Sequence, residues 1–473
     1  MRSLVVLACC FLALAAVVPP TTFAAAPCDI VLFVADDHGY GHVGHNGNAA
    51  IHTPNIDHFA AGALAFTHAF SGSPSCVPSR ATLYSGLMPL RHGAYLNHSQ
   101  TYEHVKTLPA YLQPLGYRVV LANKTHVAPR EVYPFEYVEA TLPPRPDRDR
   151  RYRLEGLDTA AIDRLLADHR ATRADQPLCL VLGESSPHVM WQENEGYDAS
   201  ALPVEPYLVD TPATRDGLAR YYSDVSAADR RFGEVLTSLD RHGFADALVI
   251  YTADQGPEWP HCKWNLYDGG LRVPFFLRWP RKAAAGASTA ALTSLCDVLP
   301  TLIEAAGGAA PTGIDGRSFL PVVLGRSDHH RDELFAAHSG DGVMNDFPAR
   351  CVRTPTHKLI LNLKPSNTYT THFTQVADVD HGLIWRTWVE KAKTDPQAAA
   401  IIDRFQHRGE IELYDLAADP DELNNLAALA EHAKLVADLR SRLATWMRLQ
   451  GDEGLATEQA GRERLEAMKR GKK

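Results

Sequence analysis

The sequence has 473 residues, of which 45% are hydrophobic and 22% are charged, and this is the composition of an ordinary globular protein. A chain of this length can bury a large core, and we expect roughly two or three domains. Its formal charge of −9 at neutral pH argues against a nucleic-acid partner, because nucleic acids are bound by basic surfaces. An anionic substrate would therefore need a site whose positive charge is assembled locally.

The beginning of the chain has the pattern of a secretory signal peptide. Arg2 is followed by an apolar run over residues 4–18 and by small residues at 21–26, so we expect a signal peptide of residues 1–24, cleaved after Ala24. The apolar run is too short to span a membrane, and no later stretch is long and apolar enough, so we expect no membrane span. The mature protein is predicted to be soluble and exported, and its location to be secreted, periplasmic or lysosomal.

Four apolar runs are predicted to be strands buried on both faces, and each is followed by polar residues. The runs cover residues 29–36, 117–122, 178–183 and 247–253. The polar residues at or just beyond their ends are Asp36 and Asp37, then Lys124 and His126, then His188, and finally Asp254 and Gln255, with Lys263 a little further on. Because ligands bind beyond the carboxyl ends of the strands in open α/β sheets, we expect these side chains to gather at one edge.

The segments between these runs predict helices. Helical patterns cover residues 53–62, 108–115, 158–169 and 214–239, and a further short strand is predicted at 273–278. This alternation predicts an α/β fold with a large, mostly parallel central sheet. Residues 145–153 are rich in charge and are predicted to form an exposed loop.

The pattern changes after about residue 340. Short runs near residues 349–352, 358–363 and 410–414 predict a small antiparallel sheet, and a helix is predicted to end near Arg448. The basic end from Arg462 is predicted to be frayed. We therefore expect a catalytic domain of residues 25–344 and a smaller C-terminal α+β subdomain of residues 345–473.

The segment Cys76 to Gly86 reads Cys-Val-Pro-Ser-Arg-Ala-Thr-Leu-Tyr-Ser-Gly. It follows a Gly/Ser/Pro turn at residues 71–75, and Pro78 suits the first turn of a helix, where its missing N–H has no partner to lose. A helix start presents free N–H groups and partial positive charge, which favours an anion. Taken alone, a cysteine beside a helix start is more often a buried structural cysteine than a reactive one.

The order Cys-x-Pro-Ser-Arg with a glycine six residues later resembles the signature of the type I sulfatases. This resemblance implies an alkaline-phosphatase-like sandwich and the oxidation of Cys76 to formylglycine by a formylglycine-generating enzyme. It also implies a metal site formed by Asp36, Asp37, Cys76, Asp254 and Gln255. Asp36, Asp37, Asp254 and Gln255 offer side-chain oxygens, and the modified Cys76 would add an oxygen of its hydrated aldehyde. An irregular set of oxygens favours Ca²⁺ over Mg²⁺. The sequence departs from the family at Gln255, where Asn or His is commoner.

The resemblance also implies roles for the basic residues. Arg80 and Lys124 would hold the hydrated aldehyde and the sulfate oxygens, and His188 or Lys263 would protonate the leaving group. His126 would then accept a proton as sulfate is expelled. Lys124, His188 and Lys263 are therefore expected to bind substrate as well as to act in catalysis.

Within this family, several segments resemble the heparan N-sulfatases (sulfamidases) more than the arylsulfatases. They lie at residues 124–129 and 131–135, 210–215, 256–267 and 412–426. The resemblance implies that the substrate is the N-sulfate of glucosamine in heparan-type saccharides, and it leaves a homodimer open. Lys263 stands where the sulfamidases usually have Arg, so a two-pronged donor becomes a single ammonium.

Three alternatives stay open at the level of the sequence. The sulfate could be O-linked on another sugar or on an aryl group. The anion could contain phosphorus, because the same superfamily includes phosphonate and phosphodiester hydrolases. If Cys76 stays a thiol, the protein could bind sulfated glycans without hydrolysing them.

Overall fold

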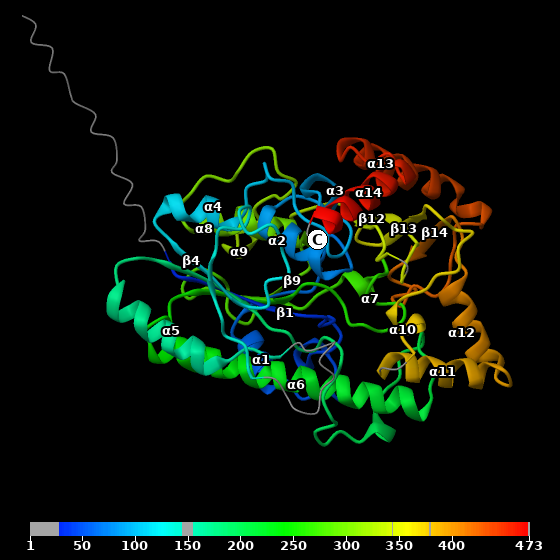
Figure 1. Cartoon of the computed structure of the whole chain (residues 1–473), viewed down its shortest axis with the longest axis horizontal. Coiled ribbons are helices and arrows are strands. Elements are labelled where there is room, and N and C mark those ends of the chain that lie inside the picture. Colours follow the sequence, from blue (N-terminus) through cyan, green and yellow to red (C-terminus); the bar gives the residue numbers. More distant parts are fainter. Residues whose placement is uncertain (1–27, 144–154, 343, 378–379, 472–473) are drawn as a thin grey trace, which may run out of the picture.

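The computed structural model describes residues 28–143, 155–342, 344–377 and 380–471 (Figure 1). The predicted signal peptide and the predicted loop at 145–153 lie outside these residues. In the part of the chain that is described, no helix combines the length and the apolar character needed to cross a membrane.

The main sheet is formed by the predicted buried strands and by shorter strands beside them. Its strand order is β5-β4-β6-β1-β7-β8-β2-β9. The bounds are β1 Ile30–Ala35, β2 Leu64–Phe66, β4 Arg118–Asn123, β5 Glu136–Val138, β6 Leu178–Gly183, β7 Leu248–Ala253, β8 Phe275–Arg278 and β9 Ser288–Thr289. The strands from β5 to β7 are parallel, and β8 runs antiparallel to both of its neighbours. The prediction of a large, mostly parallel sheet is therefore confirmed.

Strand β1 lies at the centre of this sheet. Phe33 is paired in register with Leu182 of β6 and with Tyr251 of β7, and every residue of β1 is buried. Such a strand can be apolar on both faces only if both faces are covered. The continuous apolar run in the sequence therefore follows from the position of the strand in the fold.

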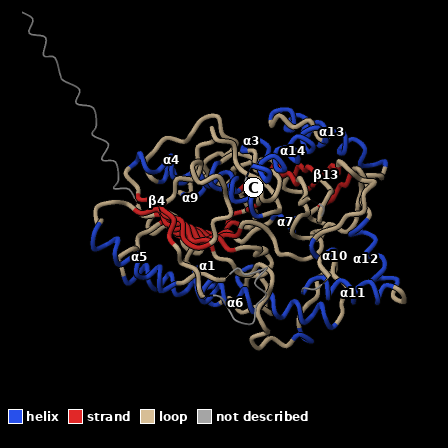
Figure 2. The backbone as a smooth tube through the Cα atoms, in the orientation of Figure 1, coloured by secondary structure: helices blue, strands red, loops and turns tan. Residues whose placement is uncertain are grey.

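Helices cover the two faces of the sheet (Figures 1 and 2). One face carries α1 (Pro54–Ala61), α5 (Thr159–Thr172) and the long α6 (Pro212–Arg241). The other carries α2 (Cys76–Ser85), α4 (Leu108–Leu112), α8 (Val298–Ala305) and α9 (Leu320–Val323). The result is the α/β sandwich expected from the sequence. The short helices α3 (Pro89–His92) and α7 (Asp268–Leu271) lie in connecting segments, and β3 (Ala69–Phe70) pairs with β10 (Thr293–Ser294) beside the main sheet.

A second, antiparallel sheet has the order β11-β12-β13-β14. Its strands are β11 Leu334–His338, β12 Ala349–Arg353, β13 His357–Asn362 and β14 Ile411–Asp415, and α13 (Ala433–Leu449) packs on it. The predicted boundary at residue 345 falls between β11 and β12, so β11 joins this sheet from the N-terminal side. The helices α10 (His372–Gln375), α11 (Asp380–Ala392) and α12 (Pro396–Gln406) were not predicted.

The end of the chain differs from the prediction. The described residues from Arg462 on belong to helix α14 (Leu455–Gly471), so the prediction of a frayed end is wrong for them. Arg464 donates hydrogen bonds from its two terminal nitrogens to the carbonyl oxygens of Gly93 and Gln100, at 2.9 and 2.7 Å. These contacts fix the helix against a distant part of the chain, and no local sequence pattern predicts them.

Candidate active site

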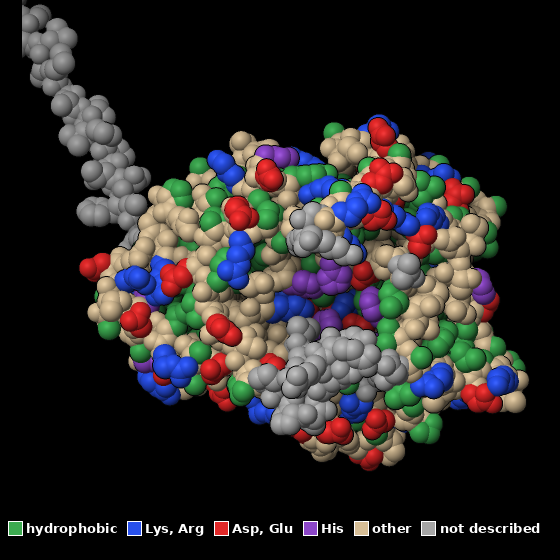
Figure 3. All heavy atoms as spheres, in the orientation of Figure 1, with side chains coloured by type: hydrophobic (Ala, Val, Ile, Leu, Met, Phe, Trp, Pro, Cys, Tyr) green, Lys and Arg blue, Asp and Glu red, His purple; other side chains and the backbone are tan. Residues whose placement is uncertain are grey.

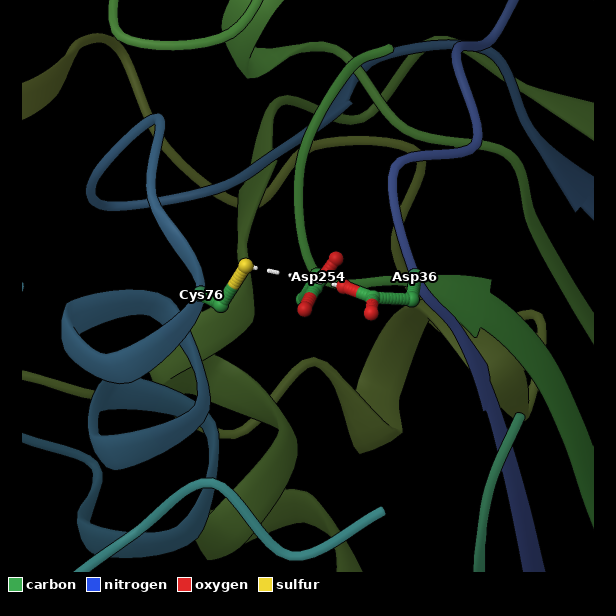
Figure 4. Close-up of side chains that lie close together, drawn as sticks. All are labelled: Asp36, Cys76 and Asp254. Carbon is green, nitrogen blue, oxygen red and sulfur yellow. Dashed lines mark hydrogen bonds between the residues drawn. The ribbon is translucent and has the colours of Figure 1, made fainter. Parts of the chain in front are cut away.

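The carboxyl ends of β1, β4, β6 and β7 lie at the same edge of the sheet, as predicted. Asp36 and Asp37 follow β1, and Asp254 and Gln255 follow β7, so four oxygen-bearing side chains meet beside the first residue of α2. All four are fully buried. Figure 4 shows Asp36 and Asp254 beside Cys76, which comes from a different element. The tertiary structure thus brings together residues that are far apart in the sequence.

Cys76 is the first residue of α2, and Ser75 before it is extended. The thiol Sγ lies 3.5 Å from Asp36 Oδ1 and 3.0 Å from Gln255 Nε2. Burial and the charge of Asp254 raise the pKa of the Cys76 thiol well above its ordinary value, although Lys263 opposes them. The cysteine is therefore held as a neutral thiol at the centre of a polar cluster.

Arg80 lies one turn along α2 from Cys76. Its Nε donates to Asp254 Oδ2 at 2.8 Å, and one terminal nitrogen is 3.7 Å from Asp36 Oδ1. The side chain is fully buried, and neither terminal nitrogen has a hydrogen-bond partner among the described residues. Buried guanidinium nitrogens without partners are costly, so this arrangement suits an anion placed next to Cys76.

The oxygen donors near Cys76 fit a hard divalent cation. Asp36, Cys76 and Asp254 each place one ligand atom within 4.8 Å of the others. Gln255 Oε1 is buried and has no hydrogen-bond partner in the described part of the chain. Carboxylate and amide oxygens in an irregular arrangement are the donor set that Ca²⁺ accepts. Asp37 has a positive φ of 66°, a strained backbone conformation that turns the chain sharply after β1.

Lys124 and His126 follow β4. The Lys124 ammonium is hydrogen-bonded to Asp36 Oδ2, so it belongs to the cluster around Cys76. His126 Nε2 lies 3.5 Å from Nδ1 of His98, an exposed residue that the sequence analysis did not single out. Burial and the charge of Lys124 lower the pKa of His126 well below its ordinary value. His126 is therefore within the field of the basic residues, although its hydrogen-bond contact is to His98.

Lys263 and His188 approach the cluster from the other side. Lys263 Nζ donates to Asp37 Oδ2 at 2.7 Å and to Glu258 Oε2 at 2.8 Å. His188 Nε2 lies 3.8 Å from Asp37 Oδ2, and its Nδ1 contacts the Val189 carbonyl. Burial disfavours the Lys263 ammonium, but Asp37 and Glu258 outweigh it and raise the pKa of Lys263 well above its ordinary value.

Glu258 is the main residue that the sequence analysis missed. It lies five positions before Lys263, within the segment that carries the resemblance, and its place between Pro257 and Lys263 is the signal that could have found it. Burial opposes its ionisation, but Lys263 and His381 hold the pKa of Glu258 below its ordinary value. Glu258 adds a further carboxylate to the site and so lowers its positive charge by one.

The site reaches the surface at His188, whose side chain is 20% exposed. Figure 3 shows a hollow near the middle of this face in which histidine, basic and acidic side chains gather. A hollow with these groups at its base is suited to a small anionic ligand.

Comparison with known proteins identifies the family. A family model described as "Sulfatase" matches residues 29–309, and one described as "N-sulphoglucosamine sulphohydrolase, C-terminal" matches residues 258–376. An ulvan-active sulfatase of Formosa agariphila is 30% identical over 431 residues, which are 90% of this chain and 80% of the relative. The human N-sulphoglucosamine sulphohydrolase is 29% identical over 465 residues, covering 89% and 90% of the two chains.

Solved structures agree on the fold. A protein solved in complex with its substrate D-glucosamine-2-N,6-O-disulfate superimposes with a TM-score of 0.67 at 19% identity, over 90% of this chain and 99% of that one. The family match covers more than half of the sequence and includes the whole edge where Asp36, Cys76 and Asp254 meet. The chain therefore belongs to the sulfatase family and is a hydrolase of sulfate esters or sulfamates.

Proposed function

We propose that this protein removes sulfate from a sulfated saccharide, that its preferred bond is the N-sulfate of glucosamine in heparan-type chains, and that it uses formylglycine made from Cys76 together with Ca²⁺. The observation that carries the proposal is the position of Cys76. It stands at a helix N-terminus among buried carboxylates and buried cations, with a thiol that burial keeps neutral. A neutral thiol is a weak nucleophile, so a modified side chain accounts better for this setting.

Burial also bears on when the modification takes place. Cys76 is 1% exposed, and every residue of α2 is buried. A formylglycine-generating enzyme could not reach the thiol in the folded protein. We therefore propose that the partner enzyme acts on the unfolded chain during export, which agrees with the predicted signal peptide. The hydrated aldehyde would supply a hydroxyl nucleophile that the thiol does not provide.

The proposed cation ligands are Asp36, Asp37, Asp254, Gln255 and the modified side chain at position 76. A bound Ca²⁺ would polarise oxygen atoms next to it and offset the repulsion between the buried carboxylates. Among the described residues, Arg80, Lys124 and Lys263 form ion pairs with these carboxylates.

The basic residues divide into binding and proton-transfer groups. Arg80 and Lys124 are proposed to hold the sulfate oxygens, because both already point at the carboxylates around Cys76. Lys263 is proposed to bind the sulfate, and the proton for the leaving group is proposed to come from His188 or Lys263. Burial and the charge of Lys263 lower the pKa of His188 well below its ordinary value, whereas Lys263 keeps its proton strongly. His126, beside the exposed His98, is proposed to accept the proton in the second half of the reaction.

The preference for an N-sulfate rests on similarity. The C-terminal family match begins at residue 258 and includes Lys263, and the human relative of that name aligns over most of the chain. A sulfatase described as ulvan-active is about equally similar, so an O-linked sulfate on another sugar is the second candidate. The two differ in the leaving atom, which is nitrogen in one and oxygen in the other.

The test begins with protein expressed with its leader and together with a formylglycine-generating enzyme. Mass spectrometry of the peptide that contains Cys76 should show the aldehyde and no thiol. Sulfate release should be fastest with N-sulfoglucosamine, slower with 6-O-sulfoglucosamine, and faster with an aryl sulfate than with the matched aryl phosphate. Cys76→Ala should bind Ca²⁺ but show no turnover.

Each arm has an outcome that contradicts the proposal. Wild-type activity in the Cys76→Ala protein would show that the nucleophile is not at position 76. Faster release of phosphate than of sulfate would point to a phosphorus-based substrate. Tight binding of saccharide to protein with an intact thiol and no sulfate release would identify a binding protein.

A further inference from the structure

Two carboxylates hold Lys263 from different sides. Its Nζ donates to Asp37 Oδ2 at 2.7 Å and to Glu258 Oε2 at 2.8 Å, and all three side chains are at most 4% exposed. A lysine ammonium has three N–H donors, so two are committed to these carboxylates and one remains for a ligand. With two of its bonds fixed, the direction of the third is also fixed.

Glu258 connects Lys263 to the C-terminal region. Its second oxygen, Oε1, lies 3.4 Å from Nε2 of His381 on α11, and Oε2 lies 4.0 Å from Nε2 of His188. Helix α11 packs on α6, which in turn covers the main sheet. The carboxylate of Glu258 thus accepts a hydrogen bond from Lys263, and histidines from two other segments lie within ion-pair distance of it.

The same group of residues could be taken for a second metal site. Asp37, His188 and Glu258 each offer a ligand atom, and these atoms lie within 4.8 Å of one another. However, the Lys263 ammonium already donates to both carboxylates. The Lys263 ammonium therefore takes the place that a metal cation would have between Asp37 and Glu258. These two carboxylates serve to hold the Lys263 side chain.

We propose that Glu258 is a positioning residue for Lys263, and that His381 of α11 fixes Glu258 in turn, so that the third N–H of Lys263 points at a sulfate oxygen. The inference rests on the proposed function, in which Lys263 binds the sulfate. Glu258 touches neither the sulfate nor the leaving group and acts only through Lys263. The helix α11 thereby contributes to the site without contacting the substrate.

A positioning role and a purely electrostatic role predict opposite results for Glu258→Gln. Removing a negative charge close to the site would strengthen the binding of an anion if only Coulomb attraction mattered. If Glu258 positions Lys263, binding should weaken, because Lys263 collapses onto Asp37. Glu258→Asp keeps the charge but shortens the side chain, so it should weaken binding only in the positioning case.

The experiment measures two quantities on wild type, Glu258→Gln and Glu258→Asp. Isothermal titration calorimetry gives the affinity for inorganic sulfate, and steady-state kinetics with an aryl sulfate give kcat and KM. We expect both variants to bind sulfate about 10- to 100-fold more weakly, and kcat/KM to fall by a similar factor. Thermal unfolding identifies a variant that has lost its fold.

A double-mutant cycle tests whether Glu258 acts through Lys263. In a Lys263→Met background, Glu258→Gln should have little further effect on sulfate affinity, and additive losses would overturn the proposal. His381→Asn should weaken sulfate binding in the same direction but less. The matched controls are Glu390→Gln on the exposed face of α11 and His407→Asn after α12, which should leave the affinity unchanged.

The remaining outcomes separate this inference from the proposed function. If wild type binds sulfate but does not hydrolyse the aryl sulfate, the proposed function fails, and the affinities of the variants still decide the role of Glu258. Unchanged or tighter sulfate binding by Glu258→Gln overturns the positioning role. A wild-type protein that does not bind sulfate overturns it as well.

Discussion

Gln255 stands between a carboxylate and the cysteine. Its Nε2 donates to Asp37 Oδ1 at 2.6 Å and lies 3.0 Å from Cys76 Sγ, while its Oε1 has no hydrogen-bond partner among the described residues. The two ends of an amide have nearly the same shape, so a half turn about its last bond would present the oxygen to a cation at the same place. At this position the longer Gln can therefore serve where other sulfatases are expected to use Asn or His.

We predict that Gln255→Leu lowers the affinity for Ca²⁺ about 10-fold or more, because the variant removes one of the oxygen ligands of the cation. Calorimetric titration of metal-free protein with CaCl₂ measures the effect. Gln176→Leu is the control, since Gln176 bonds the Gly116 carbonyl away from the site. Equal Ca²⁺ affinities for wild type and Gln255→Leu would show that the amide is not a ligand.

At the scale of single elements, α14 shows how a terminal helix can be fixed by contacts with the catalytic domain. Arg464 lies 4.3 Å from the centre of the Tyr102 ring and bonds two carbonyls of the segment after α3. Glu458 pairs with the fully buried Arg350 of β12. Gly461 faces the Tyr95 ring so closely that an added Cβ would lie 2.5 Å from it. The helix therefore depends on a small residue at this crossing.

We predict that Gly461→Val destabilises the protein by about 1 to 3 kcal/mol, the usual cost of overpacking a tight contact. The free energy of unfolding in urea measures this change. Ala467→Val on the exposed side of the same helix introduces the same side chain without the clash, and it should cost less than about 1 kcal/mol. Equal costs for the two variants would show that α14 is not packed as described.

Helix α11 was not predicted from the sequence, although its residues have a helical pattern. Ile384, Trp385 and Trp388 are buried at helical spacing, so the signal for a helix was present in the sequence. The partner of its His381 is Glu258, more than a hundred residues earlier, and no periodic pattern connects the two. An element can thus be visible in a sequence while its contribution to a site is not.

Across the whole molecule, several histidines are buried in a neutral state. His38, His92 and His338 are fully or almost fully buried, and burial lowers their pKa values to about 4, about 3 and about 4. His92 accepts a hydrogen bond at Nδ1 from the Ala94 N–H, and its Nε2 lies within hydrogen-bond distance of Thr82 Oγ1 and of the Pro78 carbonyl. A second ring proton would break the first of these contacts.

Because the folded His92 resists protonation, its contribution to the free energy of unfolding should decrease as the pH is lowered. The unfolded chain takes up a proton below pH ~6.5 while the folded protein does not, so the free energy of unfolding decreases as the pH drops toward about 3. We predict that the stability difference between wild type and His92→Gln shrinks by about 1.5 kcal/mol from pH 6.5 to pH 5. Urea unfolding at the two pH values measures it.

The control for this prediction is Gln113→Leu, which changes an amide that donates to the Pro134 carbonyl at 3.0 Å and removes no ionisable group. Its stability difference from wild type should vary little over the same pH range. A difference for His92→Gln that stays constant or grows toward pH 5 would contradict a neutral, buried His92.

The sequence by itself determined the central part of this protein. The strands β1, β4, β6 and β7 are short apolar runs with polar residues at or just beyond their ends, and both features are local in the chain. Parallel strands share one carboxyl edge, so Asp36, Asp37, Asp254 and Gln255 had to meet there once the sheet was predicted. The segment from Cys76 to Gly86 is also local, and it became α2 with Cys76 as its first residue.

Only the tertiary structure decided which groups touch around that core. The contacts of Glu258 with Lys263 and His381, of His126 with His98, and of α14 with the segment after α3 join parts of the chain whose separation no pattern encodes. The physical reason is that burial stabilises any contact between closely fitting apolar surfaces or paired polar groups. The partner of a loop or a terminal helix therefore depends on how the whole molecule packs.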